Sequence, residues 1–374
     1  MVERGLIALA VGLIAGGTSA FIMPWLIHLA ARYDILSYPT EPRQVHRRPL
    51  PRIGGPGIFL GFVTGLALSF VLPVERFPIE IERIALLVIG SGLVVGSVLY
   101  DDLMGLRPLP KLLWQIAAAA IIILPRLRGP EHGLVIEQFR NPFGGMTTLP
   151  LIIAVLFTFF WIVGMMNTVN FLDGLDGLAG TVVTIACVVL FLHTFFRPAG
   201  NPQFTISLLP MALGAATLGF LVFNWHPARI LMGDSGAMFL GYALAVTAII
   251  GGAKIATALL VLWLPILDVA WLILYRLRLG RSPMAADRSH LHHRLLDRGW
   301  SQRQIVGLFA VVSSAFGAAA LLLSGPLVKL LVLSAAGILG LVALALLARQ
   351  TPKAAAKTEQ SVNQPVLPQP PRRS

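Results

Sequence analysis

The chain has 374 residues, of which 56% are hydrophobic and only 12% are charged, and its mean hydropathy is +0.79. A soluble domain carries about a quarter charged residues, so this composition excludes an ordinary soluble protein and predicts a polytopic membrane protein. The net charge of +12 could suggest a nucleic-acid partner. However, the basic residues lie between apolar runs, which indicates membrane orientation and contact with anionic lipid or phosphate, and no nucleic acid. The single cysteine, Cys187, excludes an intrachain disulfide.

The apolar runs predict an all-α protein with about eleven membrane-spanning helices. The first run continues to residue 31, which is too long for a cleaved signal peptide. Residues 133–143 predict a small hairpin or a loop. The expected spans are residues 5–31, 53–72, 84–100, 111–124, 150–168, 178–196, 205–224, 236–252, 255–275, 304–324 and 327–348.

The basic residues are divided unevenly between the two sets of loops that join these spans. One set and the tail hold 20 Lys and Arg residues, and the other side holds 9. The positive-inside rule therefore puts the first set in the cytoplasm and the N-terminus outside. The chain's polar clusters all belong to that cytoplasmic set. Transporters usually carry polar residues at the bilayer midplane, so this clustering favours a surface site over an ion-coupled transport path.

Residues 167–178, Asn-Thr-Val-Asn-Phe-Leu-Asp-Gly-Leu-Asp-Gly-Leu, form the most polar stretch beside a span. Its four polar side chains recur at intervals of three, so on a helix they would share one half of the surface. Two carboxylates and two amides at the end of a membrane helix are costly unless they hold a cation or a polar ligand. These residues are Asn167, Asn170, Asp173 and Asp176.

Three further aspartates lie at the ends of spans. Asp101 and Asp102 follow an apolar run, where the helix dipole disfavours carboxylates, so a bound cation or a proton to be abstracted would explain them better. Asp234 lies between Gly233 and Gly236, which suits a tight turn near a phosphate.

Residues 287–294, Asp-Arg-Ser-His-Leu-His-His-Arg, hold three histidines in four positions. Zinc is disfavoured because no second ligand pair or cysteine accompanies them, whereas histidines beside arginines fit a diphosphate or a sugar. The basic loop 43–55 predicts either simple positive-inside charge or a phosphate contact, and its prolines stiffen it. Asp268, inside an apolar span, is either paired with an arginine as structural support or part of the site, and structural support is favoured.

Five aspartates are thus expected at one membrane face. Oxygen ligands in such number suit Mg²⁺, or Mn²⁺ in its place, which bind through one or two carboxylates together with substrate phosphates. With arginine, lysine and histidine as anion contacts, the set favours phosphoryl transfer from a soluble phosphorylated donor to a lipid acceptor. The five are Asp101, Asp102, Asp173, Asp176 and Asp234.

At these positions the chain resembles the polyprenyl-phosphate N-acetylhexosamine-1-phosphate transferases of glycosyltransferase family 4. The resemblance covers about residues 34–300 and rests on five motifs in order. They are HRRPLPRIGG (46–55), YDDLMGLRPLPKLLWQ (100–115), NTVNFLDGLDGLAG (167–180), FNWHPARILMGDSGAMFLG (223–241) and DRSHLHHRLL (287–296).

The resemblance implies a multi-pass enzyme of the bacterial inner membrane that transfers a sugar 1-phosphate from a UDP-sugar to undecaprenyl phosphate, releases UMP and requires Mg²⁺. Residues 1–348 would form the transmembrane catalytic domain, and 349–374 a disordered cytoplasmic tail. Membrane lipid is the expected surrounding, and a homodimer is left open. The first and last motifs resemble the branch that uses UDP-N-acetylglucosamine and begins teichoic acid, O-antigen or related glycans.

The resemblance also implies roles for individual residues. Asp101 and Asp102 would position the acceptor phosphate or accept its proton, Lys111 would lie near the diphosphate, and Mg²⁺ would be held by Asp234 with Asp173. A metal-bound Asp234 is a poor nucleophile, which favours direct attack by the lipid phosphate over an aspartyl intermediate. The implied substrate-binding residues are Arg52, Asn170, Asp173, Asp176, Asn224, His290, His292 and His293.

Three alternatives stay open at this point. The peptidoglycan branch, which uses UDP-N-acetylmuramoyl-pentapeptide, usually shows a TPTMGG-like loop and a P-x-HHH pattern, both absent here. A transporter predicts acidic residues at mid-span, where Asp268 alone comes close. A non-catalytic membrane subunit predicts loss of the motifs, yet all five acidic positions are present.

Overall fold

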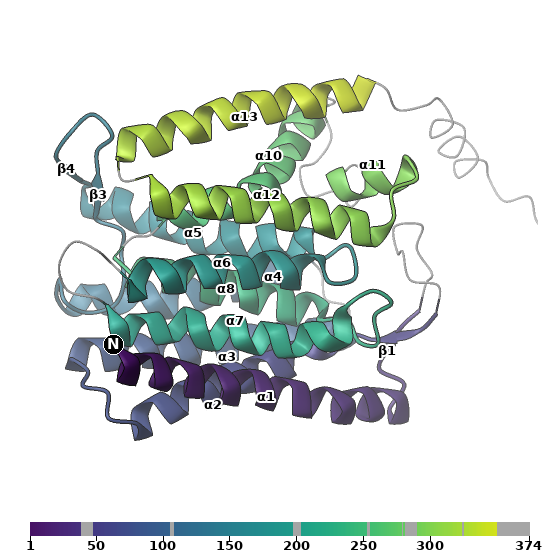
Figure 1. Ribbon diagram of the computed structural model, residues 1–374, viewed down its shortest axis with the longest axis horizontal. Coiled ribbons are helices and arrows are strands. Elements are labelled where there is room, and N and C mark those ends of the chain that lie inside the picture. Colours follow the sequence, from purple (N-terminus) through teal and green to yellow (C-terminus); the bar gives the residue numbers. More distant parts are fainter. Residues whose placement is uncertain are drawn as a thin grey trace, which may run out of the picture.

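The computed structural model is a bundle in which most of the long helices lie side by side (Figure 1). It describes residues 1–38, 48–104, 108–196, 203–252, 255–278, 280, 290–323 and 325–349. Ten helices in these ranges are long and apolar enough to cross a membrane, and a bent pair supplies up to one more crossing. The predicted all-α architecture with about eleven spans is therefore confirmed. Of the predicted features, the tail from 350 onward, Arg43 to Arg47 and Asp287 to Ser289 lie outside the described residues.

The elements follow the predicted spans closely. Most helices begin and end within a few residues of the expected limits, because lipid-length apolar runs specify them. They are α1 (Val2–Arg32), β1 (Leu36–Ser37), β2 (Leu50–Pro51), α2 (Gly54–Val71), α3 (Pro78–Met104), α4 (Pro108–Ile123), the 3₁₀ helix η1 (Leu124–Arg128), β3 (Gln138–Arg140), β4 (Met146–Thr148), α5 (Leu151–Leu172), α6 (Leu178–Phe195), α7 (Phe204–Asn224), α8 (Gly233–Ile250), α9 (Ile255–Val261), α10 (Trp263–Arg278), α11 (Leu291–Asp297), α12 (Gln302–Leu322) and α13 (Pro326–Arg349).

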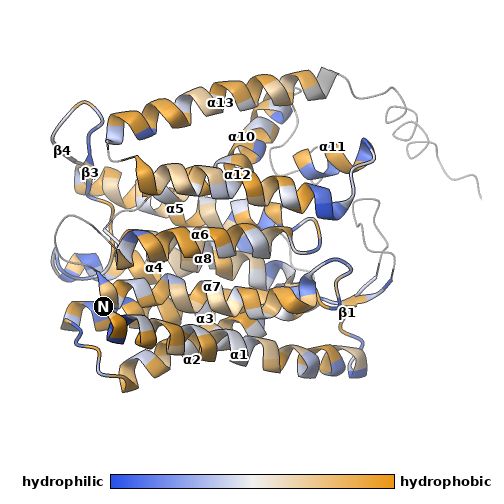
Figure 2. Cartoon of the chain, viewed as in Figure 1, coloured by the Kyte–Doolittle hydropathy of each residue, from blue (hydrophilic) through white to orange (hydrophobic). Residues whose placement is uncertain are grey.

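The bundle has two polar ends. Apolar residues cover the middle of the helices, and hydrophilic residues gather where the helices end (Figure 2). The N-terminus and the β3–β4 hairpin lie at one end, while β1 and α11 lie at the other (Figure 1). The polar motifs predicted from the sequence belong to the end that holds β1 and α11, so the fold gathers them on one membrane face.

Helix α8 forms the centre of the bundle. Of its most apolar stretch 94% is buried, more than in any other spanning helix that the structure describes, and it packs against α5, α3 and α2. Small residues permit this close packing: a Cβ on Gly241 would fall 2.5 Å from the carbonyl oxygen of Met165. Because α8 is enclosed on all sides, its first turn, which carries Asp234, is fixed at the middle of the polar end.

The predicted span 255–275 is broken. Helices α9 and α10 meet at an angle of 79° instead of forming one rod. Pro265 lies in the first turn of α10 and has no N–H to donate to the carbonyl of Val261, which removes a hydrogen bond at the join. Apolar content alone predicted a continuous helix there.

Two smaller differences concern element ends. The predicted hairpin exists but lies further along the chain, with Gln138 paired to Thr148 and Arg140 to Met146. Helix α3 continues to Met104, so the two aspartates that were expected to follow a span lie inside its last turn.

Candidate active site

Backbone hydrogen bonds join the first motif to the fourth. The N–H of Leu231 donates to the carbonyl of Pro51 at 2.8 Å, and the N–H of Gly54 returns a bond to Leu231 at 3.0 Å. The pair of glycines makes the approach close, since a Cβ on Gly55 would fall 2.5 Å from the nitrogen of Gly236. Two segments about 180 residues apart in sequence thus bring the arginine of one motif beside the aspartate of the other.

Three carboxylates and two basic side chains alternate around Asp234. Arg52 Nη2 lies 2.5 Å from Asp234 Oδ1 and 3.6 Å from Asp102 Oδ1. On the other side, Lys111 Nζ is bonded to Asp234 Oδ2 and lies 3.1 Å from Asp101 Oδ2. The order Asp101, Lys111, Asp234, Arg52, Asp102 is therefore a chain of alternating charge in which both oxygens of the central carboxylate face a cation.

The start of α8 holds this network in place. The N–H of Ser235 donates to Asp102 Oδ2 at 3.1 Å, and the positive end of the helix dipole favours the carboxylates nearby. Gly233 has a φ of +72°, and a Cβ there would fall 2.6 Å from the carbonyl oxygen of Arg52. The predicted tight turn is replaced by the first turn of α8, in which only Gly233 of the two flanking glycines has a positive φ.

Asp173 lies next to the same network. Burial raises the pKa of Asp173 to about 7; Arg52 opposes the rise, while the carboxylates of Asp234 and Asp102 add to it. Asp173 therefore loses its proton more easily when a further cation lies close to it. This property fits the predicted pairing of Asp173 with Asp234 around a divalent metal.

The predicted helical stripe of four polar residues is wrong beyond Asn170. Helix α5 ends at Leu172, and the next residues form a turn in which Gly177 has a φ of +76°. The side chain of Asp176 bonds to His226 Nδ1 at 2.7 Å and to the N–H of Ala228 at 3.1 Å. Asp176 therefore fastens the 226–228 loop.

Asn224 has a similar holding position. Its Oδ1 accepts from the N–H of Gly177 at 2.9 Å, and its Nδ2 donates to the carbonyl of Ile230 at 2.9 Å. The residue is 2% exposed, so its amide joins the turn after α5 to the segment before α8. The contact of Asn224 with substrate stays a prediction. Its two hydrogen bonds give Asn224 a positioning role between these two segments. Asn170 lies half-buried in the last turn of α5.

Two of the three histidines contact the end of α5 and the turn that follows it. His290 packs against Phe171 with 5.6 Å between ring centroids and a tilt of 34°, and it stacks on His292 at 5.5 Å. His292 fits directly over Gly174, where a Cβ would fall 2.8 Å from its Cε1. Burial lowers the pKa of His292 well below its ordinary value, and His293 and His290 add to the effect. The structure therefore joins the last motif to the third.

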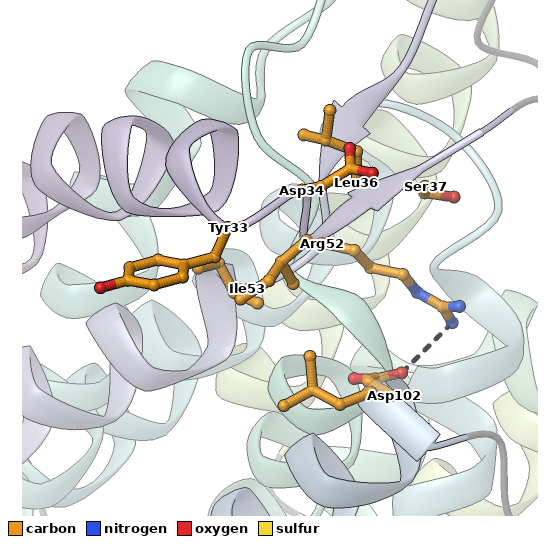
Figure 3. Close-up of a pocket in the computed structure, with 9 residues that line it drawn as sticks. Tyr33, Asp34, Leu36, Ser37, Arg52, Ile53 and Asp102 are labelled. Atoms are coloured by element: carbon orange, nitrogen blue, oxygen red, sulfur yellow. Dashed lines mark ion pairs between the residues drawn. The ribbon is translucent and has the colours of Figure 1, made fainter.

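A cavity of about 380 Å³ opens beside the charged network. Figure 3 shows Arg52 reaching across it toward Asp102 at the end of α3. The remaining wall comes from the end of α1 and from β1, and combines polar with apolar groups. The lining residues are Tyr33, Asp34, Ile35, Leu36, Ser37, Arg52, Ile53, Asp102 and Leu103.

The described residues contain no group of three or more Asp, Glu, His or Cys side chains arranged around one point. Mg²⁺ commonly uses only one or two carboxylates and completes its octahedron with water and substrate phosphate. The donor set of Asp234 and Asp173 fits such an ion, provided that Lys111 or Arg52 leaves an oxygen of Asp234.

Sequence reasoning missed the partners of two aspartates, Asp176 and Asp268. His226, which binds Asp176, lies in a His-Pro pair without any periodic signal, and Gln302 reaches the N–H of Asp176 from α12 at 3.2 Å. Asp268 was expected to give structural support, and it holds His290 at 2.9 Å. Only spacing in three dimensions identifies these pairs.

Comparison with known proteins shows to which family the chain is similar. The model of glycosyl transferase family 4 matches residues 84–252. A decaprenyl-phosphate N-acetylglucosaminephosphotransferase of Mycolicibacterium smegmatis is 34% identical over 342 residues, 84% of this chain and 82% of the relative. A probable undecaprenyl-phosphate N-acetylglucosaminyl 1-phosphate transferase of Bacillus subtilis is 30% identical over 337 residues, 86% and 87% of the two chains.

A more distant group of relatives has another name. A phospho-N-acetylmuramoyl-pentapeptide-transferase of Chlorobium luteolum is 30% identical over 312 residues, 74% of this chain and 80% of the relative. Each of the three relatives covers between 74% and 86% of this chain. The chain is therefore a multi-pass membrane protein that belongs to glycosyl transferase family 4.

Proposed function

We propose that the protein transfers N-acetylglucosamine 1-phosphate from UDP-N-acetylglucosamine to undecaprenyl phosphate and releases UMP, which starts a cell-envelope glycan. The observation that carries the proposal is the alternating network of three carboxylates with Lys111 and Arg52 at one end of a membrane bundle. The names of the relatives from Mycolicibacterium and Bacillus support a polyprenyl phosphate as acceptor and N-acetylglucosamine phosphate as the transferred group.

The reaction is an in-line displacement at phosphorus. An oxygen of the lipid phosphate forms a bond to the β-phosphorus of the donor, the bond from that phosphorus to the bridging oxygen breaks, and UMP leaves. Bound Mg²⁺, held by Asp234 and Asp173, would neutralise charge on the diphosphate and on the leaving group. Positioning and electrostatics supply nearly all of the catalysis in such a reaction.

The chain's own residues have distinct tasks in this scheme. Lys111 and Arg52 are the cations that can turn from Asp234 to the diphosphate oxygens. Asp101, held 3.1 Å from Lys111, orients the acceptor phosphate. A phosphate has its second pKa near 6 and is mostly ionised near pH 7, so orientation contributes at least as much as proton removal.

The positive-inside count supports a cytoplasmic position for the face that carries the network, with the N-terminus outside, in a bacterial inner membrane. A nucleotide sugar is soluble and a polyprenyl phosphate is held in the bilayer, so a site at this boundary can meet both substrates.

The test supplies the purified protein with undecaprenyl phosphate, Mg²⁺ and either UDP-N-acetylglucosamine or UDP-N-acetylmuramoyl-pentapeptide. We expect lipid-linked product and UMP with the first donor, and none after chelation of the metal. Product with the pentapeptide donor alone would reverse the donor assignment in favour of the function named for the Chlorobium relative. Product with neither donor would refute the proposed function.

Two variants locate the chemistry. Asp234→Asn is expected to abolish turnover while the protein stays folded. The substitution replaces one carboxylate oxygen by NH₂ and removes the negative charge that a metal ligand requires. Glu75→Gln, which neutralises an exposed carboxylate in the loop between α2 and α3 at the opposite end of the bundle, is the matched control and should keep full turnover. Retained activity of Asp234→Asn would contradict the metal assignment.

A further inference from the structure

Asp268 is a buried carboxylate of α10 with both oxygens engaged by one short segment. It is 5% exposed, and an acidic side chain inside a membrane bundle is costly unless it has specific partners. Its Oδ2 lies 2.9 Å from His290 Nδ1, and its Oδ1 accepts from the N–H of Leu291 at 2.8 Å. The two bonds fall on consecutive residues at the beginning of α11.

These bonds fix α11 against α10. A helix of seven residues, Leu291–Asp297, is too short to be stable alone, and its first N–H groups have no partner within the helix. Asp268 caps it from a neighbouring helix, where a local Ser or Asp usually serves. The position of the histidine segment over the bundle therefore depends on a residue outside the five motifs.

The bond to Asp268 also determines which ring nitrogen of His290 carries the hydrogen. A carboxylate offers only acceptors, so Nδ1 carries the hydrogen in the bond to Asp268. The opposite nitrogen, Nε2, is then the one that is available to a ligand. His290 also packs against the tilted ring of Phe171 and stacks on His292, and His292 lies over Gly174 beside Asp173.

We propose that Asp268 is a positioning residue of the transferase site, which holds His290 with Nε2 presented as a hydrogen-bond acceptor to a hydroxyl group of the sugar in the nucleotide-sugar donor. The proposal rests on the proposed function. This role differs from simple support of the fold. The carboxylate of Asp268 acts through one residue, His290, by fixing the hydrogen of that ring on Nδ1. A carboxylate that orients a metal-ligating histidine typically changes affinity or activity by about 10- to 100-fold when it is replaced, and an effect of this size is expected for Asp268 and His290.

The test is Asp268→Asn, which keeps the shape of the side chain. The N–H of Leu291 still requires the amide oxygen, so the NH₂ group faces His290 and the hydrogen on that ring moves to Nε2. We expect kcat/KM for UDP-N-acetylglucosamine to fall about 10- to 100-fold, with the KM for the lipid phosphate unchanged. Asp297→Asn, which removes a charge from the exposed end of α11, is the control and should leave kcat/KM unchanged.

A double-mutant cycle separates positioning from folding. In a His290→Ala background, Asp268→Asn should cause no further loss beyond about twofold, because the residue through which it acts is gone. An equal loss in both backgrounds, or wild-type kcat/KM in Asp268→Asn, would overturn the proposal.

The ring hydrogen can be followed without turnover. In ¹⁵N-histidine-labelled protein, the signal that disappears in His290→Ala should change from the Nδ1–H form to the Nε2–H form in Asp268→Asn. An unchanged signal would overturn the positioning role. A wild-type protein that is inactive with both donors but shows the expected signal would refute the proposed function, and with it the assignment of Asp268 to that site.

Discussion

Gly174→Ala is expected to disrupt the contact between the turn after α5 and the histidine segment. The added Cβ would fall 2.8 Å from Cε1 and 3.0 Å from Cδ2 of His292, and closer still to Nε2. Ordinary van der Waals contact between such atoms needs about 3.5–4.0 Å, so one side must move. The His292 ring is 1% exposed, with the rings of His290 at 5.5 Å and His293 at 4.4 Å from it.

The expected cost follows from this enclosure. Overpacking of a well-filled interior typically costs about 1–3 kcal/mol of folding stability. The neighbouring rings of His290 and His293 leave no free space into which the His292 ring could move. For a chain of this size the apparent melting temperature should fall by roughly 2–6 °C. Turnover should fall as well, because Asp173 adjoins the displaced turn.

The assay is thermal unfolding of the purified variants in detergent, with turnover measured in parallel. Gly164→Ala on α5 is the matched control, since a Cβ there meets no atom within 4 Å, and it should change stability by less than about 0.5 kcal/mol. In a His292→Ala background, Gly174→Ala should cost little. A wild-type melting temperature in Gly174→Ala, or an equal loss without the histidine, would refute the reasoning.

Lys111→Gln frees an oxygen of Asp234 from its ion pair. Mg²⁺ should then bind about tenfold more tightly, which corresponds to about 1.4 kcal/mol, while turnover falls. A thermal-shift titration with Mg²⁺ that gives equal or weaker binding than wild type would contradict this expectation. Asp176→Asn weakens the bond to His226 and should cost about 1–3 kcal/mol in detergent unfolding, so a neutral result would exclude a fastening role. The lowered pKa of His292 means that below about pH 6.5 the unfolded chain binds more protons than the folded one. The contribution of His292 to the free energy of unfolding is therefore fully present above about pH 6.5. Below that pH the free energy of unfolding falls by up to about 1.4 kcal/mol per pH unit. His292→Gln should flatten this slope, and an unchanged profile would show that other groups cause it.

The positions of the spanning helices could be predicted because each is written in one continuous apolar run. A membrane helix satisfies its backbone hydrogen bonds within itself, so length and composition are sufficient to place it. The predictions failed where backbone chemistry interrupts the run. The break before Pro265 and the turn beginning at Asp173 depend on a missing N–H and on glycine conformations, which hydropathy does not measure.

The residues of the candidate site could be named from the sequence, but their partners could not. Carboxylates beside apolar runs are costly, and this cost makes Asp101, Asp102, Asp173 and Asp234 conspicuous. Their grouping with Arg52 requires the backbone bonds between the first and fourth motifs, which no local pattern encodes.

The sequence by itself determined a membrane bundle with its chemistry at one face, and the segment from Asn167 to Leu178 as part of that face. Only the tertiary structure separated the two aspartates of this segment. Asp173 lies beside the charged network, whereas Asp176 turns to His226. The physical reason is that an interval of three residues fixes a direction only while the helix continues, and α5 ends before either aspartate is reached.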